Sequence, residues 1–150
     1  MQQLASAALA PLFQVPWSVA GPACSPHQVR VLIVDHDTRV CAGLKLMMLD
    51  LGYRSTRTAR YAIRALTLVG AFAPDIALLE LDLPDMSVYR LAQAMRNHAR
   101  THLCRLSLIA VADAEAHASG VLARAAGFDG YLPKPIRPPE LDHVLESLRR

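Results

Sequence analysis

The sequence predicts a doubly wound α/β fold, in which helices cover both faces of a parallel β-sheet. Short apolar runs typical of buried strands alternate with longer segments whose apolar residues recur every three or four positions, as they do in helices. Five such strand–helix units follow one another from residue 30 onward. Apart from a more polar run at residues 53–58, the strand runs are continuously apolar, which indicates a sheet that is buried on both faces.

The apolar patterns place the elements in order. Strands are expected at residues 31–34, 53–58, 76–79, 106–111 and 130–132, and helices at residues 40–51, 62–69, 88–95, 118–125 and 141–148. Three helices are predicted to stop at a glycine, at Gly52, Gly70 and Gly127, because glycine tolerates the left-handed conformation that often ends a helix. The last helix is entered through Pro138 and Pro139, since proline is favoured in a first helical turn.

Composition excludes several classes of protein. The chain has 150 residues, which is enough for one domain with some chain left over. Hydrophobic residues make up 53% and charged residues 19%, a mixture too apolar for a disordered chain. The net charge of +3 is not gathered into the basic stripe of a nucleic-acid binder. No apolar run approaches the roughly 18 residues of a membrane span. Three cysteines, Cys24, Cys41 and Cys104, lack the spacing of a zinc site or a disulfide framework.

Residues 1–29 differ from the rest of the chain. They contain no Asp, Glu, Lys or Arg and include four prolines, which interrupt any long helix. We expect a flexible leader here, followed by a domain over residues 30–150. One alternative is an arm that docks on the domain or on a partner and buries Phe13 and Trp17. Another is a secretory signal, although the segment lacks a basic start and a long apolar core.

Polar side chains follow several of the predicted strands. Ligands and substrates of doubly wound folds bind at the carboxyl ends of the strands, so these residues form the candidate site. Two carboxylates and a lysine could hold a hard cation or a phosphoryl group there. They could equally be an ion pair and helix caps, with Asp37 or Thr38 capping the first helix and Asp113 the fourth. The residues at the strand ends are Asp35, His36, Asp37, Glu80, Asp82, Ala112, Asp113 and Lys134.

Four segments together resemble a known family. VLIVDHD, DIALLELDLPDMSVY, LIAVADA and AGFDGYLPKP have the order and spacing of the receiver domain of bacterial two-component response regulators. The resemblance covers roughly residues 30–148. It implies a flavodoxin-like (βα)5 fold with the strand order 2-1-3-4-5. It also implies an aspartyl phosphate received from a histidine kinase, a Mg²⁺ ion, and a switch on the face of the fourth and fifth units.

The chain departs from the receiver pattern at the site itself. The phosphoacceptor position holds Glu80 in place of Asp, and the second of two adjacent acids after the first strand is replaced by His36. Glutamate is longer by one methylene, and misplacing a reacting group by about a bond length can cost about 10²-fold in rate. Imidazole is a poor ligand for Mg²⁺, so this ion is expected to bind weakly or not at all, through Asp35, Glu80 and Asp82. His36 itself is interpreted as a solvent-exposed surface histidine.

Other receiver positions are partly kept. Ala112 stands where the pattern has the switch Thr or Ser, and alanine cannot donate a hydrogen bond to a phosphoryl oxygen. Tyr131, at the position of the switch aromatic, is either a half-buried core residue or a working part of the switch. Lys134, which precedes a proline, matches the phosphate-binding lysine. It is expected to pair with Glu80 and also with Asp35.

These features predict a single-domain signalling protein of a two-component phosphorelay. It would be a degenerate receiver, or pseudo-receiver, that acts through protein–protein contacts without a standard Asp phosphoacceptor. By family analogy, the first helix would meet a histidine kinase, a phosphotransfer protein or another regulator, and the last helix a second copy in a homodimer. We expect no DNA-binding domain, no membrane segment and a cytoplasmic location.

Two other functions are left open by the sequence. The chain could still be phosphorylated, at Glu80, Asp82 or Asp85. The segment from Glu80 to Asp82 also resembles the D-x-D motif of haloacid-dehalogenase-like phosphotransferases, in which carboxylates and Mg²⁺ act on phosphate esters. Against this third function, the nucleophile would again be Glu and the lysine–proline context is that of receivers. We therefore predict that the chain is not an enzyme.

Overall fold

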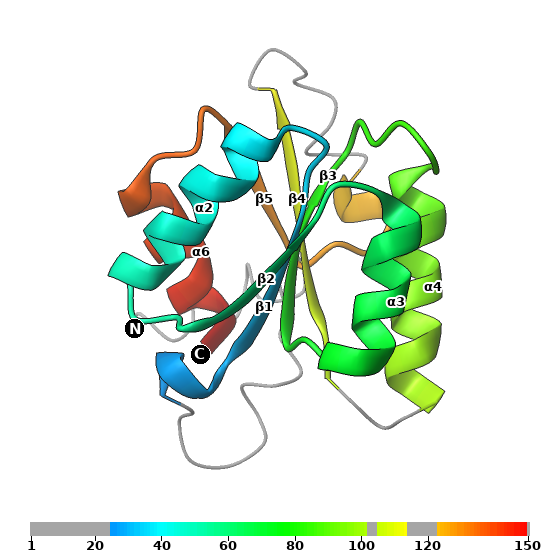
Figure 1. The fold of residues 1–150 in the computed structure, drawn as a ribbon, viewed down its shortest axis with the longest axis horizontal. Helices are drawn as coiled ribbons and strands as arrows, with labels where there is room; N and C mark the ends of the chain where they lie inside the picture. The colour runs from blue at the N-terminus through cyan, green and yellow to red at the C-terminus, as the bar shows by residue number, and fades with distance from the viewer. Residues whose placement is uncertain (1–24, 102–104, 114–122, 150) are drawn as a thin grey trace, which may run out of the picture.

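The structure, a computed structural model, describes residues 25–101, 105–113 and 123–149. These residues form a five-stranded sheet with the strand order β2-β1-β3-β4-β5. All neighbouring strands pair in parallel. Helices lie on both faces of the sheet (Figure 1). The predicted doubly wound fold and its strand order are both confirmed.

Most elements lie close to their predicted positions. The strands are β1 (Arg30–Val34), β2 (Ser55–Ala59), β3 (Ile76–Glu80), β4 (Ser107–Asp113) and β5 (Gly130–Lys134). The helices are α2 (Thr38–Asp50), α3 (Ala62–Phe72), α4 (Val88–Thr101) and α6 (Pro138–Arg149), with a 3-10 turn η3 (Pro26–Gln28) before β1. Most of the helix expected at 118–125 lies outside the described residues, and residues 123–125 are helical. Within the described ranges, no helix is both long and apolar enough to cross a membrane.

Two predicted boundaries are wrong for local reasons. β2 begins at Ser55, because the preceding Tyr53 is buried and its N–H donates to the Met48 carbonyl at 2.8 Å, completing the end of α2. Gly52, with a φ of +95°, makes this turn, as predicted. α3 does not stop at Gly70: it runs on to Phe72 and is closed by Ala73, which takes the left-handed conformation itself.

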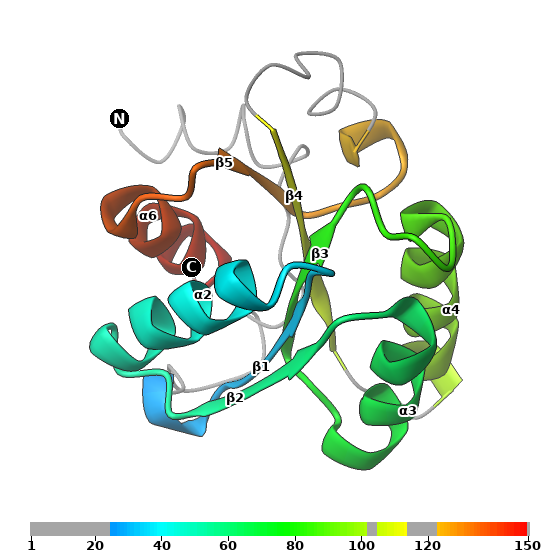
Figure 2. The same ribbon diagram turned by 45° about the horizontal axis from the view of Figure 1, so that its top comes forward.

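Two apolar layers pack on the two faces of the sheet. α2 and α6 cover one face, and α3 and α4 cover the other (Figure 2). Successive side chains of a strand point to opposite faces. Val31 and Ile33 of β1 therefore join the first layer, whereas Leu32 and Val34 join the second. Every one of these positions is buried, which explains why the strand is continuously apolar.

Parallel pairing brings the strand ends to one edge of the sheet. Val34 pairs with Leu79, so the residues that follow them, Asp35 and Glu80, are neighbours across β1 and β3. On the other side of β3, β4 pairs with β5, whose last residue is Lys134. The carboxylates and the lysine of the candidate site therefore meet at the same edge.

Replacing Leu78 by alanine should destabilise this fold strongly. Leu78 lies in the central strand β3 and is 1% exposed. The cavity left by its side chain should lower the free energy of unfolding by about 2–5 kcal/mol. Leu49→Ala on α2, where the side chain is 53% exposed, is the matched control and should change it by less than about 0.5 kcal/mol. Urea denaturation followed by circular dichroism compares the two, and equal losses would contradict the described layers.

Candidate functional site

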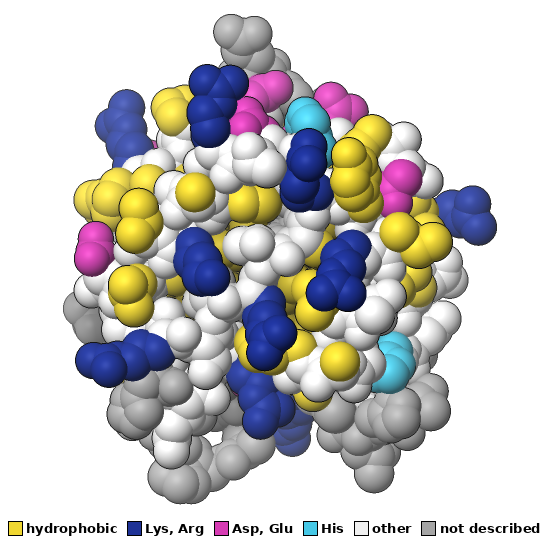
Figure 3. All heavy atoms as spheres, viewed as in Figure 1, with side chains coloured by type: hydrophobic (Ala, Val, Ile, Leu, Met, Phe, Trp, Pro, Cys, Tyr) yellow, Lys and Arg dark blue, Asp and Glu magenta, His cyan; other side chains and the backbone are white. Residues whose placement is uncertain are grey.

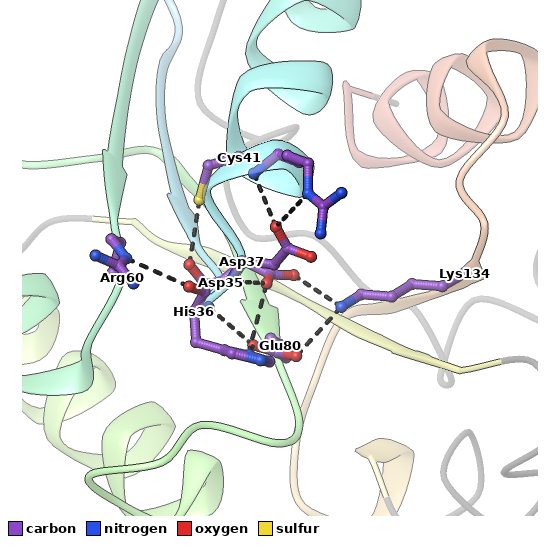
Figure 4. A network of polar contacts seen from close by, with 8 residues as sticks. Asp35, His36, Asp37, Cys41, Arg60, Glu80 and Lys134 are labelled. Atoms are coloured by element: carbon purple, nitrogen blue, oxygen red, sulfur yellow. Dashed lines mark hydrogen bonds and ion pairs between the residues drawn. The ribbon is translucent and has the colours of Figure 1, made fainter.

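An ion cluster joins three strand ends (Figure 4). Asp35 follows β1, Glu80 ends β3 and Lys134 ends β5. The Lys134 Nζ lies 2.9 Å from Asp35 Oδ2 and 3.2 Å from Glu80 Oε1. Both carboxylates are almost fully buried, at 1% and 4% exposure. The expected pairing of Lys134 with Glu80 and Asp35 is confirmed.

His36 closes the other side of Glu80. Its ring Nδ1 lies 2.6 Å from Glu80 Oε2, and its backbone N–H donates to the same oxygen at 3.0 Å. The side chain is 51% exposed. The expectation of a solvent-exposed histidine is therefore correct only in part, because Nδ1 is bound to Glu80. Sequence reasoning missed the contact with Glu80. The signal that could have revealed it is the longer reach of glutamate at a strand end beside the histidine.

The four groups of the cluster shift one another's pKa. Burial raises the pKa of Asp35 by more than its hydrogen bonds with Lys134 and the Asp37 backbone lower it. Burial acts in the same direction on Glu80, but the hydrogen bonds from His36 and the nearby ammonium of Lys134 outweigh it, so the pKa of Glu80 is lowered. The hydrogen bond and the charge of Glu80 raise the pKa of His36. The pKa of Lys134 is raised despite its burial, because two carboxylates stabilise the ammonium.

The turn between β1 and α2 fixes Asp35 and His36 in place. Asp37 donates its N–H to Asp35 Oδ1 at 2.9 Å, and its own carboxylate accepts the Arg39 N–H at 2.8 Å. Asp37 is thus the N-cap of α2, as one of the two sequence interpretations held. Cys41 donates to the Asp35 carbonyl at 3.2 Å from inside the first turns of α2. Asp37 is therefore occupied in the turn and does not take the place of the missing second acid.

Asp85 has a structural role that the sequence did not reveal. Its Oδ1 accepts the Ala62 N–H at 2.9 Å, and its Oδ2 accepts the Ile63 N–H at 3.1 Å. These hydrogen bonds cap α3, whose own N-cap residue, Tyr61, forms no side-chain cap. They also lower the pKa of Asp85. Both carboxylate oxygens are therefore used to join the loop after β3 to the start of α3.

The remaining predicted residues surround an open cavity of about 480 Å³ above the cluster. Asp82 is exposed and lines this cavity together with Glu80 and Lys134. Ala112 lines it from the end of β4 and contributes only a methyl group. Tyr131 does not line it: its side chain is half-buried and packs against the layer under α3 and α4. The helix that Asp113 was expected to cap begins outside the described residues.

The donor set suits a magnesium ion poorly. Asp35, His36 and Glu80 each place one ligand atom within 4.8 Å of the others. However, Mg²⁺ requires oxygen ligands in a tight octahedron, and one of these three donors is an imidazole nitrogen. Both carboxylates are also paired with Lys134, and His36 holds one oxygen of Glu80. We therefore assign no step of a mechanism to Mg²⁺.

The pKa of His36 should be raised in solution and should fall when Glu80 is neutralised. Because the raised value requires the Glu80 carboxylate, Glu80→Gln should return it toward the ordinary value of about 6.5. The stabilisation from this pair is present below the ordinary pKa and is lost as the pH rises through the raised value. NMR titration of the imidazole resonances, in metal-free buffer, measures both. Asp85→Asn, a carboxyl-to-amide change away from the ring, is the control and should leave the titration unaltered.

Replacing Lys134 by methionine should destabilise the fold. The change leaves two buried carboxylates without their cation, which costs about 3–5 kcal/mol for a broken buried pair. The deficit should shrink as the pH falls, because protonation removes the uncompensated charges. Lys45→Met, at the only other lysine and on the exposed surface of α2, is the control, with an expected change below about 0.5 kcal/mol. Equal effects of the two substitutions, measured by denaturation at several pH values, would refute the role given to the cluster.

Comparison with known proteins agrees with this arrangement. Residues 31–146 match the sequence profile of the family described as the response regulator receiver domain. The chain is 31% identical over 122 residues to the DNA-binding response regulator MtrA of Mycobacterium tuberculosis (strain ATCC 25618 / H37Rv), a match that covers 81% of this chain and 51% of the relative. The chain thus spans about half the length of the curated relatives it matches.

Solved structures show the same likeness. A putative response regulator from Chloroflexus aurantiacus superposes with a TM-score of 0.72 at 28% identity, over 81% of this chain and 98% of that one. A CheY-like receiver domain protein from Methanospirillum hungatei superposes with a TM-score of 0.68 at 27% identity, over 80% and 93% of the two chains. The Lys134–Pro135 peptide bond is cis. From the sequence match and the shared fold, we conclude that this chain belongs to the family of response regulator receiver domains.

Proposed function

We propose that this chain is an atypical receiver of a two-component system, which works by protein–protein contact and is not switched by ordinary phosphorylation. One observation carries the proposal: both oxygens of the residue in the phosphoacceptor position are engaged. Glu80 Oε2 is held by the ring and the backbone of His36, and Oε1 is held by Lys134. A nucleophile bound on both sides and almost fully buried is poorly placed to attack a phosphoryl group.

The switch position supports the same proposal. In the family pattern, a hydroxyl at the end of the fourth strand senses the phosphoryl group, and Ala112 has none to offer. A phosphoryl group on Glu80 would therefore lack its usual contact with β4. Glu80 supplies a permanent negative charge, although one charge is fewer than the roughly 1.5 to 2 of a phosphoryl group. The acceptor position would thus keep one covalent state.

A receiver that is phosphorylated on a different carboxylate is the second candidate. Asp82 favours it, because this residue is exposed and lines the cavity beside Lys134. Asp85 is less suitable, since both of its oxygens cap α3. Phosphate-ester hydrolysis is disfavoured by the same engagement of Glu80 that disfavours phosphorylation. Receiver domains in general are signalling modules, and we propose that this chain has no catalytic turnover.

The proposed partners follow from the exposed surfaces. α2 presents Leu46 and Leu49, which are 63% and 53% exposed, and such apolar side chains are typical of protein-binding faces. We assign this face to a histidine kinase, a phosphotransfer protein or another regulator, and place the protein in the cytoplasm. The exposed face of α6 carries Glu140, Asp142 and His143 and would pair with a second copy through polar contacts.

Any binding of Mg²⁺ to this chain would be weak and would use Asp35, Glu80 and Asp82.

Intact-mass measurement after incubation with Mg²⁺ and acetyl phosphate tests this function. We expect the natural chain to gain no phosphoryl group. Glu80→Asp should gain one, because the shorter carboxylate is freed from His36 and stands where the family has its acceptor. Adding His36→Asp should raise the yield further by restoring the second acid. The Glu80→Gln variant is the control for modification elsewhere and should remain unmodified.

A phosphorylated natural chain would refute the proposal. Mapping the modified residue by peptide mass then separates Glu80 from Asp82, and Asp82→Asn should abolish the modification in the second case. If neither Glu80→Asp nor the variant that adds His36→Asp gains a phosphoryl group, with folding verified by circular dichroism, residues other than these two must prevent phosphorylation.

A further inference from the structure

A second, apolar groove runs along α2 beside the ion cluster. Its volume is about 350 Å³, and its apolar walls come from α2 and from the turn between β5 and α6. Leu46 and Leu49 extend the apolar surface from the groove around the outside of the helix. Figure 3 shows exposed hydrophobic side chains at its left, over α2. The apolar residues that line the groove, called here the α2 groove, are Val40, Gly43, Leu44, Met47, Pro135 and Ile136.

The groove has space to receive a side chain, and apart from Asp113 and Lys134 its lining residues carry no charge. At Gly43, an added Cβ would meet no atom within 4 Å. Between Arg39 and Asp50, α2 carries a single charged residue, Lys45. By contrast, the nearby edge strand β2 is flanked by the exposed arginines Arg54 and Arg60 and contains Arg57. An uncharged, apolar ligand therefore fits the α2 groove better than it fits the adjacent surface.

The sequence before the described residues has the composition of such a ligand. The first described residues, in η3, lie against the end of α2, where Pro26 is 3.6 Å from a Cβ placed on Gly52. Val29 is buried in the same layer as Met48 of α2. The described part of the chain therefore begins beside the end of α2, and residues 1–24 precede it. They contain no Asp, Glu, Lys or Arg, and they include Phe13 and Trp17.

We propose that residues 1–24, the arm, bind in the α2 groove of their own chain and bury Trp17 there. The length allows it, because 24 extended residues reach up to about 80 Å, whereas the 13 residues of α2 span only about 20 Å. Tethering also favours it, since a short linker holds a ligand at a millimolar effective concentration. The groove is weakly polar, so the contact is driven by removal of apolar surface from water.

Docking of the arm would regulate access to α2. If α2 is the face that partners use, as proposed above, the arm competes with them and must be displaced before they bind. This regulatory consequence rests on the proposed function, whereas the docking does not. The two can fail separately, because docking is measured on the chain alone and partner binding is not involved.

Fluorescence of Trp17 tests the proposal directly, because the chain has no other tryptophan. In the full chain, emission should lie at a shorter wavelength, and quenching by acrylamide should be weaker, than in the same chain unfolded by guanidinium chloride. Gly43→Gln should abolish both differences, since its side chain fills the groove with a polar amide. A Cβ added at Gly43 meets no atom within 4 Å, and glutamine has a better helix propensity than glycine, so we expect the fold to be preserved, which circular dichroism checks.

Gly70→Gln is the matched control. It makes the same change within a helix, on α3 at the opposite face of the sheet, where the nearest side-chain atom is His98 Cε1 at 3.9 Å. It should retain the shielding of Trp17. Native emission equal to that of the unfolded chain would overturn the proposal, as would shielding that survives Gly43→Gln. Shielding that disappears on dilution would also overturn it, because a second copy would then be the occupant.

Discussion

Two buried carboxylates at neighbouring strand ends are the constraint on which the site depends. Asp35 and Glu80 are brought together by the pairing of β1 with β3, and neither can reach solvent without leaving the sheet edge. Burial of two like charges is unfavourable unless a cation compensates them. Lys134 supplies this cation from β5, on the far side of β4. The ion cluster thus links three strands at the edge where doubly wound folds bind their ligands.

The extra methylene of glutamate changes how this cluster is closed. An aspartate at position 80 would end about 1.5 Å short of the present carboxylate, a single bond length. The longer side chain brings Oε2 to the His36 ring while Oε1 remains at Lys134. In the proposed function, His36 and Glu80 are therefore complementary changes. A histidine replaces the second acid after β1, and this histidine binds the longer carboxylate at position 80. Ala112 fits the same account, since a site without a phosphoryl group needs no hydroxyl to sense it.

The parts of the fold that could be predicted from the sequence depend on local patterns or on charge. β1 follows from an apolar run, and the Lys134 pairing follows because opposite charges meet at one sheet edge. The contacts of His36 and Asp85 were not predicted, because each depends on the path of a loop. Asp85 caps a helix that begins 23 residues earlier in the chain, so no local capping signal reveals it. The predicted C-terminal end of α3 was also wrong, because Ala73 takes the left-handed conformation that Gly70 was expected to supply.

In the proposed function, the acceptor position is not modified, and regulation would shift to the surfaces around the site. Within the described residues, the α2 groove and the cavity above the cluster share Lys134 and Asp113 as lining residues. A molecule that fills the groove therefore lies next to the ammonium that neutralises Asp35 and Glu80. Binding there could alter the cluster without any covalent change at Glu80, by excluding water from Lys134 and strengthening its ion pairs. In the proposed function, an occupant of the α2 groove would therefore act on the cluster without phosphorylation of Glu80.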